Sequence, residues 1–424
     1  MDLLDDLAWR GQLYQSTDLG SLRQHLGSAS RGVYAGFDPT GDSLTIGNLV
    51  PIMMLLRFQR AGHRPLVVMG GGTGMIGDPS GKETERQLLT LETIEQNVQS
   101  QRRVFEHMLD FSGPAAARIV NNHDWLGKLG FLEALRDIGK HFSINMMIQK
   151  DSVRERLEAR EQGISYTEFS YMLLQADDFS YLFKEQGISV QMSGSDQWGN
   201  IVAGVDFIRR TQQAEAFALT APLITKADGT KFGKTEKGAV WLTPERTSPY
   251  AFYQFWLNTA DAEIPKYLKT FTLFEHARIE ELIAEHERDP GARVAHKALA
   301  AHVTELLHGK DGLERAEAAT GALFSGDVAG LARDTLEELF GSAPSASIPK
   351  ARLSGEGLDV VDLLVEGQVV KSKREAREFL ANGAILINGE KATPELRLKP
   401  EHLLHGEILL IRRGKKNWHV VRCL

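Results

Sequence analysis

The chain has 424 residues, of which 42% are hydrophobic and 25% are charged, and its formal net charge is −7 at pH 7. This length exceeds one ordinary core, so we expect two or three domains. The negative net charge argues against a general nucleic-acid binder, and the short apolar runs argue against a membrane span. The single cysteine, Cys423, excludes an internal disulfide framework and a thiolate zinc cluster. The acidic start of the chain argues against a leader sequence, so we expect a cytoplasmic protein without membrane contact.

Up to about residue 220, short apolar runs alternate with longer amphipathic stretches. Four of the apolar runs predict buried strands, at residues 33–35, 65–69, 117–120 and 188–192. Helical spacing lies between them, as at 91–109 and 131–142. This alternation predicts an α/β fold, with a Rossmann-like parallel sheet covered by helices on both faces.

The rest of the chain has a different pattern. From Pro249 to about Phe340 the helical signals dominate and the strand signals vanish, which predicts an all-helical domain. The Ser- and Pro-rich segment 342–349 then predicts a linker. A helix at 372–382 and strands at 384–388, 407–412 and 419–422 predict a small α+β domain at the end of the chain. We therefore expect domains at 1–235, 236–340 and 355–424, with a linker at 341–354.

Two short segments far apart in the chain carry the clearest chemical signal. The first runs from Gly36 to Asn48, where a strand ends in small residues before a helix start. Such a helix start offers backbone N–H groups to a phosphate. The second is Lys-Phe-Gly-Lys-Thr at 231–235, whose two lysines can neutralise further phosphates as point charges. Together the segments predict an ATP site that lacks the kinase and P-loop signatures.

A glycine-rich loop follows the second predicted strand. Residues 72–77 match the dinucleotide fingerprint, but the sequence from Asp78 to Gly81 breaks the helix that this fingerprint requires. We interpret the loop as a place where a ligand can approach the backbone closely. Lys82 and Arg86 are four residues apart and could share a helical face beside it, or they could be ordinary surface cations.

A polar helix face and a polar strand end complete the candidate site. Tyr171, Gln175 and Asp178 have the spacing of one helical face, which could also be a solvated face. The strand that follows ends in a polar stretch at 191–200, and ligands bind at the carboxyl ends of parallel strands. Asp196 there suits a ribose, whereas Asp178 and Tyr34 suit a buried hydroxyl group.

The chain shows no pattern of resident metal ligands or covalent catalysis. Its 13 histidines lack the spacing of a metal site, and no nucleophile elbow or nucleophile–base pair is evident. We therefore predict no metal ligands and a chemistry of positioning and charge stabilisation.

Near the end of the chain, basic residues gather at the start of the helix predicted at 372–382. This helix could bind an RNA backbone or be a solvated charged helix.

Over essentially its whole length the chain resembles the bacterial-type tyrosyl-tRNA synthetases, which are class I aminoacyl-tRNA synthetases. Residues 31–49 resemble the first family signature, and residues 231–235 resemble a variant of the KMSKS loop. Residues 194–198, Gly-Ser-Asp-Gln-Trp, resemble a stretch diagnostic of the tyrosine branch. The tail resembles a small RNA-binding module shared with a ribosomal small-subunit protein.

The resemblance implies roles for the matching residues. For the substrate tyrosine they are Tyr34 and Asp178 at the phenol hydroxyl, Asp78, Tyr171 and Gln175 at the ammonium group, and Gln191 and Gln197 near the carboxylate. For ATP they are Gly36, Asp38, Thr45, Gly47, Asn48, Gly194, Asp196 and Lys234. The residues implied to stabilise the pyrophosphate in the transition state are Thr40, Lys82, Arg86, Lys231, Lys234 and Thr235. The implied RNA contacts are Lys371, Lys373, Arg374 and Arg377.

One position departs from the family pattern. The first signature normally reads His-x-Gly-His, and this chain has Thr45-Ile46-Gly47-Asn48. Asn48 keeps a hydrogen-bond donor, whereas Thr45 is shorter than histidine and uncharged. Losing one charge-assisted bond costs about 1.5–3 kcal/mol, so we expect weakened but not abolished ATP activation.

The resemblance implies a two-step reaction with ATP, L-tyrosine and tRNA(Tyr) as partners, Mg²⁺ held mainly by the phosphates, and a homodimer. Three alternatives remain at this point. A tryptophanyl-tRNA synthetase is the nearest, although Tyr34 and Asp178 suit a phenol better than an indole. A small-molecule nucleotidyltransferase would not need the helical domain or the tail. A catalytically weak RNA-binding relative would explain the missing histidine, but not the retained lysines and arginine.

Overall fold

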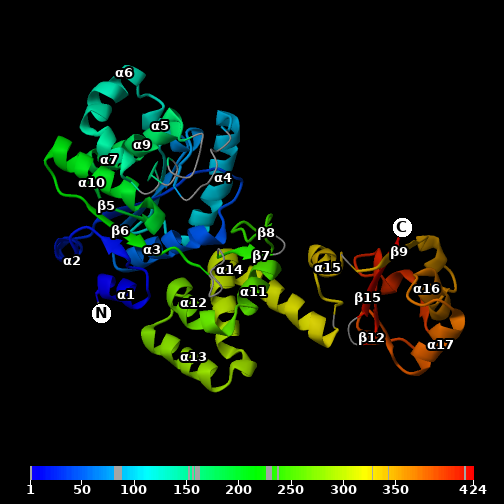
Figure 1. The fold of residues 1–424 in the computed structure, drawn as a ribbon. Coiled ribbons are helices and arrows are strands. Elements are labelled where there is room, and N and C mark those ends of the chain that lie inside the picture. The colour runs from blue at the N-terminus through cyan, green and yellow to red at the C-terminus, as the bar shows by residue number, and fades with distance from the viewer. Residues whose placement is uncertain are drawn as a thin grey trace. The chain divides into compact units, whose positions relative to one another are not determined.

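The computed structural model of the chain (Figure 1) describes residues 2–80, 88–150, 153–154, 157, 163–225, 232–235, 238–326, 328–341, 343–414 and 417–424. These residues form two compact units. The first unit spans Met1–Ser248 and Gln254–His308, and the second spans Pro249–Tyr253 and Gly309–Leu424. The domain boundaries expected at residues 235, 340 and 354 stay a prediction.

A six-stranded sheet organises the first unit. Its strands are β1 Gln15–Ser16, β2 Gly32–Phe37, β3 Arg64–Met69, β4 Arg118–Asn121, β5 Ile188–Gly194 and β6 Phe217–Ala221. They lie in the order β1-β6-β5-β2-β3-β4, with β1 antiparallel to β6 and every other pair parallel. The four predicted strands are all present, which confirms the parallel α/β sheet. The sequence did not predict β1, which has two residues, or β6, whose alanines are uncommon in strands.

Helices precede and connect these strands. They are α1 Leu3–Trp9, α2 Leu19–Ser28, α3 Leu49–Arg60, α4 Leu91–Met108, α5 His123–Leu126, α6 Phe131–Glu133, α7 Ile144–Ile148, α9 Tyr166–Gln186 and α10 Trp198–Gln212. The predicted helix at 91–109 is α4, where the Thr90 side chain accepts a bond from the Thr93 N–H at the N-terminus. The helical stretch predicted at 131–142 is present but irregular. A π-helical turn at Ala134–Ile138 and a 3₁₀ turn at Gly139–His141 follow α6.

The long apolar run at the start of α3 is a buried helix. Nearly every residue from Leu49 to Phe58 is buried, because α3 packs against β2, β3 and β5 and also against α12. Pro51 lies in the first turn, where a missing N–H breaks no helical hydrogen bond. The N-terminus of α3 continues the 3₁₀ turn η1, Ile46–Asn48, so the first signature segment is fixed to a rigid element.

The middle of the chain is helical, as the sequence predicted. Its helices are α11 Pro249–Leu257, α12 Ile264–Phe271, α13 His276–Arg288, α14 Val294–Ser325 and α15 Arg333–Phe340. A proline stands in the first turn of α12, and α14 is interrupted at Gly309, whose φ of 72° is not helical. The division between the two units falls at this glycine.

The second unit contains a five-stranded sheet in the order β12-β11-β14-β15-β9. Its strands are β9 Ser345–Ile348, β11 Ile385–Ile387, β12 Glu390–Lys391, β14 Ile408–Arg413 and β15 Asn417–Cys423. A two-stranded pair, β10 Leu358–Asp359 and β13 Arg397–Leu398, and helices α16 Val360–Glu366 and α17 Lys373–Ala381 complete it. The predicted helix at 372–382 and the three predicted strands are confirmed.

The predicted linker was wrong in one respect. Within the segment assigned to it, Ser345–Ile348 form β9, which pairs in parallel with β15. Ile348 and Leu353 are buried in the core of this unit. The backbone of small and polar residues forms hydrogen bonds at a sheet edge just as the backbone of larger residues does, and composition alone does not reveal this.

Within the part of the chain that the structure describes, no helix has the length and apolar character to cross a bilayer.

Candidate functional site

The candidate site lies where the parallel strands of the first unit end. Asp38 directly follows β2, and Asp196 follows the end of β5. Gly36 is the exposed position of β2, and no atom lies within 4 Å of the place that a Cβ would take there. A ligand can therefore approach the backbone of this strand closely at Gly36. Thr40, Gly47 and Asp196 are also exposed at this edge.

A chain of side-chain hydrogen bonds begins at Asp38. The Tyr171 hydroxyl donates to its Oδ2 at 2.9 Å, and the Thr73 hydroxyl donates to its Oδ1 at 2.7 Å. The Asn122 amide in turn donates to the Thr73 hydroxyl at 3.0 Å. Tyr171 is on α9, as the predicted helix face required, so these bonds join the ends of β2, β3 and β4 to α9.

Asp178, two turns along α9 from Tyr171, is the second carboxyl of the site. Its Oδ2 accepts a bond from the Asn122 amide at 2.8 Å, and its Oδ1 accepts one from the Trp125 indole N–H at 2.7 Å. The side chain is 4% exposed, and burial raises its pKa well above the usual range, although the two hydrogen bonds lower it. Such a group is held in one orientation by two fixed donors.

The Tyr34 hydroxyl has no hydrogen-bond partner among the described residues, although the side chain is only 2% exposed. Burial raises its pKa well above the ordinary value, and the nearby Asp178 carboxyl adds to the rise. Gln191, which pairs with Tyr34 across β2 and β5, also has a buried Oε1 without a described partner. Buried polar atoms without partners are rare in folded proteins, so this pair indicates a place for a polar ligand.

Asp78 forms a third carboxyl group near the first two. The Gln197 amide donates to its Oδ2 at 2.6 Å, and the Ser80 N–H donates to its Oδ1 at 2.9 Å. Burial raises the pKa of Asp78 to about 6, and the Asp38 carboxylate contributes to the rise. Gln175 is half-buried on the same helix as Tyr171. Three carboxyl groups in one region create a site that favours a cation.

The two signature segments contact each other. The Ile46 N–H donates to the Val240 carbonyl at 2.9 Å, and the Leu242 N–H donates to the Leu44 carbonyl at 2.8 Å. The closest approach of the loop to the first signature is at Gly233. If residue 233 carried a Cβ, that atom would stand 2.3 Å from Ile46 Cγ2. The φ of Gly233, +78°, also lies in the region that favours glycine. The loop therefore reaches the first signature only because residue 233 is a glycine.

The end of the loop is a short hairpin. Lys234–Thr235 form β7, which pairs with β8, Gly238–Ala239. The predicted residues Lys82, Arg86 and Lys231 lie outside the described residues.

Thr45 and Asn48 of the first signature bond to each other, since the Thr45 hydroxyl and N–H each donate to Asn48 Oδ1 at 3.0 Å. The Asn48 side chain thus holds Thr45, the departure from the family pattern, at the start of the turn, and the Asn48 amide keeps its N–H donors.

In the second unit, the four predicted RNA contacts are all exposed at the start of α17. Lys373 pairs with Asp362 at 2.6 Å, whereas Arg374 and Arg377 have no ion-pair partner among the described residues. The Ser372 side chain caps the helix by accepting a bond from the Glu375 N–H at 3.2 Å. The helix start is therefore rigid, and its two arginines are available to a ligand.

Sequence reasoning missed Thr73, Asn122 and Trp125. A signal existed for Asn122, since two asparagines follow the strand predicted at 117–120 at the edge where ligands bind. Nothing in the local pattern indicated the indole of Trp125, which stacks on Tyr181 with ring centroids 4.6 Å apart. These residues act through contacts between elements that lie far apart in the sequence.

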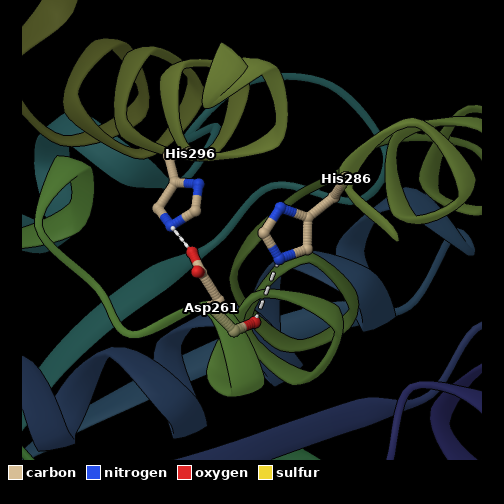
Figure 2. A group of neighbouring side chains, drawn as sticks. All are labelled: Asp261, His286 and His296. Carbon is tan, nitrogen blue, oxygen red and sulfur yellow. Dashed lines mark hydrogen bonds and ion pairs between the residues drawn. The ribbon is translucent and has the colours of Figure 1, made fainter. Parts of the chain in front are cut away.

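Among the described residues, one group has side chains that could hold a metal ion: Asp261, His286 and His296 (Figure 2). The His286 Nε2 faces the Asp261 carbonyl at 3.2 Å, and the His296 Nε2 faces the Thr259 carbonyl at 3.1 Å. Carbonyl oxygens only accept, so both Nε2 atoms carry the proton. The His296 Nε2 also lies 3.2 Å from the Asp261 carboxylate. These contacts join the 3₁₀ turn Asp261–Glu263 to α13 and α14.

The comparisons with known proteins cover both units. Residues 28–325 match the family described as tRNA synthetases class I (W and Y), and residues 338–421 match the tyrosine–tRNA ligase SYY-like C-terminal domain. The chain is 50% identical to the tyrosine–tRNA ligase of Bacillus caldotenax, over 100% of both chains. It is 48% identical to that of Roseiflexus castenholzii, over 99% of both.

The fold is similar to a solved structure as well. A C-terminally truncated mitochondrial tyrosyl-tRNA synthetase of Aspergillus nidulans superposes with a TM-score of 0.69 at 30% identity. The match covers 76% of this chain and 94% of that one. Whole-length identity and two matching family domains agree with each other, and they favour the tyrosine branch over the tryptophan branch. The chain belongs to the tyrosyl-tRNA synthetases of class I.

Proposed function

We propose that this chain is a tyrosine–tRNA ligase, which activates L-tyrosine with ATP and transfers the tyrosyl group to tRNA(Tyr). The observation that supports tyrosine as the amino acid is the Tyr34 hydroxyl, which lies beside Asp178 and has no hydrogen-bond partner among the described residues. A phenol hydroxyl can accept from Tyr34 and donate to Asp178 at once. An indole N–H can only donate, so tryptophan would leave the Tyr34 hydroxyl unpaired.

At the backbone end of the substrate we propose the roles that the family resemblance implies. Asp78, Tyr171 and Gln175 would bind the ammonium group, with the charge of Asp78 balanced by that group. Gln191 and Gln197 would lie near the carboxylate, and the Gln197 amide already bonds to Asp78. Asp38 holds the Tyr171 hydroxyl in place. These roles fit a site where carboxyl groups outnumber cations among the described residues.

For ATP, the candidate residues are those of the strand ends and the two signature segments: Gly36, Asp38, Thr40, Thr45, Gly47, Asn48, Gly194, Asp196, Lys234 and Thr235, with Lys82, Arg86 and Lys231 outside the described residues. A tyrosine carboxylate oxygen would form a bond to the α-phosphorus while the bond to pyrophosphate breaks. The lysines and arginine would neutralise charge on the departing pyrophosphate. Mg²⁺ would be held mainly by the phosphates. A ribose hydroxyl of the tRNA would then take the tyrosyl group and release AMP.

Tyrosine binding is expected to depend on pH through Asp78. The pKa of this carboxyl is raised to about 6, and only its ionised form attracts the ammonium group. Affinity should therefore be constant above pH 7 and fall below pH 6, with Kd rising up to about tenfold per pH unit. Calorimetric titration of tyrosine between pH 5 and 8 measures this. The pKa of Asp177 is also raised to about 6. The Asp78→Asn variant therefore shows which of the two carboxyl groups causes the change in tyrosine affinity with pH. That variant should bind more weakly, with a flat profile, and a flat wild-type profile would contradict the assignment.

For the tail, we propose that Lys371, Lys373, Arg374 and Arg377 bind the tRNA backbone. Replacing Arg374 and Arg377 by glutamine should flatten the salt dependence of tRNA binding by about 1.4–1.8 in the log–log slope. Tyrosine-dependent pyrophosphate exchange should stay unchanged. Filter binding over a series of salt concentrations measures the slope. The matched control is Arg397→Gln with Lys399→Gln, two exposed cations of the same unit. An equal change in the control would mean that α17 is not the contact.

We also propose that the chain is a cytoplasmic homodimer. Large apolar side chains stand exposed among the described residues between 131 and 166, and they are Phe131, Leu132, Leu135, Ile144, Met146, Ile148, Leu157 and Tyr166. Monomeric proteins rarely expose so many apolar side chains in one stretch. A second copy of the chain would cover them.

The proposed activity has a direct assay. ATP–pyrophosphate exchange is measured with each of the twenty amino acids in turn and the purified chain. We expect exchange with tyrosine and none with tryptophan. Exchange with tryptophan alone would favour the tryptophan branch, whereas a folded chain that exchanges with no amino acid would favour an inactive RNA-binding relative.

A further inference from the structure

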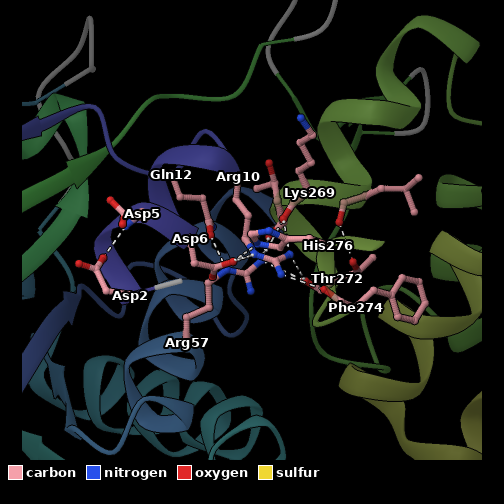
Figure 3. Close-up of polar contacts among 12 residues, drawn as sticks. Asp2, Asp5, Asp6, Arg10, Gln12, Arg57, Lys269, Thr272, Phe274 and His276 are labelled. Carbon is pink, nitrogen blue, oxygen red and sulfur yellow. Dashed lines mark hydrogen bonds and ion pairs between the residues drawn. The ribbon is translucent and has the colours of Figure 1, made fainter. Parts of the chain in front are cut away.

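Helix α3 carries the first signature at one end and a buried arginine near the other. Arg57 is 5% exposed, and Figure 3 shows its guanidinium pointing toward the segment that follows α12. Its Nη2 lies 3.0 Å from each of three carbonyl oxygens, those of Lys269, Thr270 and Thr272. Its Nε donates to Gln12 Oε1 at 2.7 Å. The arginine therefore closes the C-terminus of α12 with a charged donor.

The end of α12 needs such a donor. The last carbonyl groups of a helix have no partner inside the helix, and they form the negative end of its dipole. Arg10 of α1 assists, since its Nη1 donates to Lys269 O at 3.2 Å and its Nη2 to Phe274 O at 2.8 Å. Burial, together with Arg10, lowers the pKa of Arg57 to about 9. Because this value is still above 7, the guanidinium is charged at neutral pH.

The other side of α12 holds the second signature segment. Phe271, the last residue of α12, stacks on Phe232 with ring centroids 5.3 Å apart and an interplanar angle of 15°. Tyr267 meets the same ring edge-on at 5.2 Å. Phe232 immediately precedes Gly233, which lies against Ile46, and β7 with Lys234 comes next. Phe232 thus packs against α12, while its neighbour Gly233 touches Ile46 of η1, the turn that leads into α3.

These contacts form a closed path. It runs from the first signature along α3 to Arg57, across to the end of α12, through Phe271 to Phe232, and back to Ile46 at the first signature. We propose that Arg57 is a positioning residue for amino-acid activation, which sets the end of α12 and so holds Phe232 and Gly233 against the turn that leads into α3. The inference rests on the proposed function, because the effect is on the step that uses both signatures. Arg57 itself lies too far along α3 from its first residue to act as a ligand of ATP, since the eight residues of helix from Leu49 to Arg57 span about 12 Å.

The test replaces Arg57 by methionine, which keeps an unbranched side chain and removes every donor. We expect the kcat for tyrosine-dependent pyrophosphate exchange to fall about fivefold, while the Kd for tyrosine, which binds at the strand ends, stays within about twofold. Arg57→Lys, which keeps a charged donor, should restore part of the rate. Phe271→Leu should lower kcat in the same way, and the double variant should lose less than the product of the two single losses.

Arg413→Met is the matched control. Arg413 of β14, in the second unit, also donates to a backbone carbonyl, that of Val369 at 2.9 Å, and makes no described contact with α12. It should leave kcat unchanged even where it lowers the melting temperature. The inference is overturned if Arg57→Met and Phe271→Leu change only the melting temperature, or if Arg413→Met lowers kcat equally. If Arg57→Met does not fold, Arg57→Lys and Phe271→Leu decide the question. A wild-type chain without tyrosine-dependent exchange would contradict the proposed function itself, and that result is distinct.

Discussion

Replacing Tyr34 by phenylalanine is expected to lower the preference for tyrosine over phenylalanine by about 5- to 150-fold in kcat/KM. The Tyr34 hydroxyl is buried and has no partner among the described residues, so we expect its partner to come from the substrate. With phenylalanine bound, this hydroxyl and the Asp178 carboxyl would both lack that partner. A buried polar group left unpaired costs about 1–3 kcal/mol, and removing the Tyr34 hydroxyl removes its share of the penalty. Exchange rates with each amino acid measure the ratio.

The control for this experiment is Tyr253→Phe. Tyr253 is a buried tyrosine of the second unit, 5% exposed, and it belongs to none of the candidate site contacts. It should leave the ratio unchanged. If Tyr34→Phe also leaves the ratio unchanged, Tyr34 does not contact the substrate hydroxyl. If the ratio falls only in Asp178→Asn, Asp178 alone recognises the hydroxyl.

Replacing Gly233 by alanine is expected to slow adenylate formation by about 10- to 100-fold while leaving tyrosine affinity unchanged. The added Cβ would meet Ile46 Cγ2 at 2.3 Å, and Ile46 is fully buried, so the loop has to move. The positive φ adds a penalty of about 1–2 kcal/mol for a residue with a side chain. The neighbouring Lys234 would then move away from the first signature. Single-turnover kinetics of adenylate formation measure the rate.

Gly238→Ala separates strain from the clash. Gly238 lies in the same hairpin with a φ of +109°, but no atom stands within 4 Å of its added Cβ. It should slow adenylate formation less than Gly233→Ala does. Shortening the neighbour with Ile46→Ala should restore part of the rate of Gly233→Ala. If the two glycine variants behave alike and Ile46→Ala restores nothing, contact between the two segments is not what the reaction requires.

The parallel sheet could be predicted because its strands are buried on both faces. The run 65–69 is apolar throughout, and such a run between amphipathic helices has few other interpretations. β1 was not predicted because two residues are too few to show the alternation of apolar and polar side chains that marks a strand. β9 was not predicted because Ser345 and Ser347 are typical of linkers. For these short strands the decisive interaction is a hydrogen bond to a strand far away in the sequence.

The site was predicted in part. The spacing of Tyr171 and Asp178 placed both on one helix face, and α9 confirms that they share it. Their roles came from the resemblance, because a face of this kind could equally be solvated. The amide that links the two carboxyl groups, Asn122, lies on a segment about 50 residues away in sequence, as does Trp125. No pattern within a helix or a strand specifies such a contact.

The crystal structure of this chain with bound L-tyrosine tests the account most directly. We expect the phenol oxygen within hydrogen-bonding distance of both the Tyr34 hydroxyl and the Asp178 carboxyl, and the ammonium group against Asp78, Tyr171 and Gln175. The Asn122 and Trp125 bonds to Asp178 should remain. A tyrosine bound with its phenol oxygen away from both Tyr34 and Asp178, or with its ammonium group at Asp178, would contradict the account.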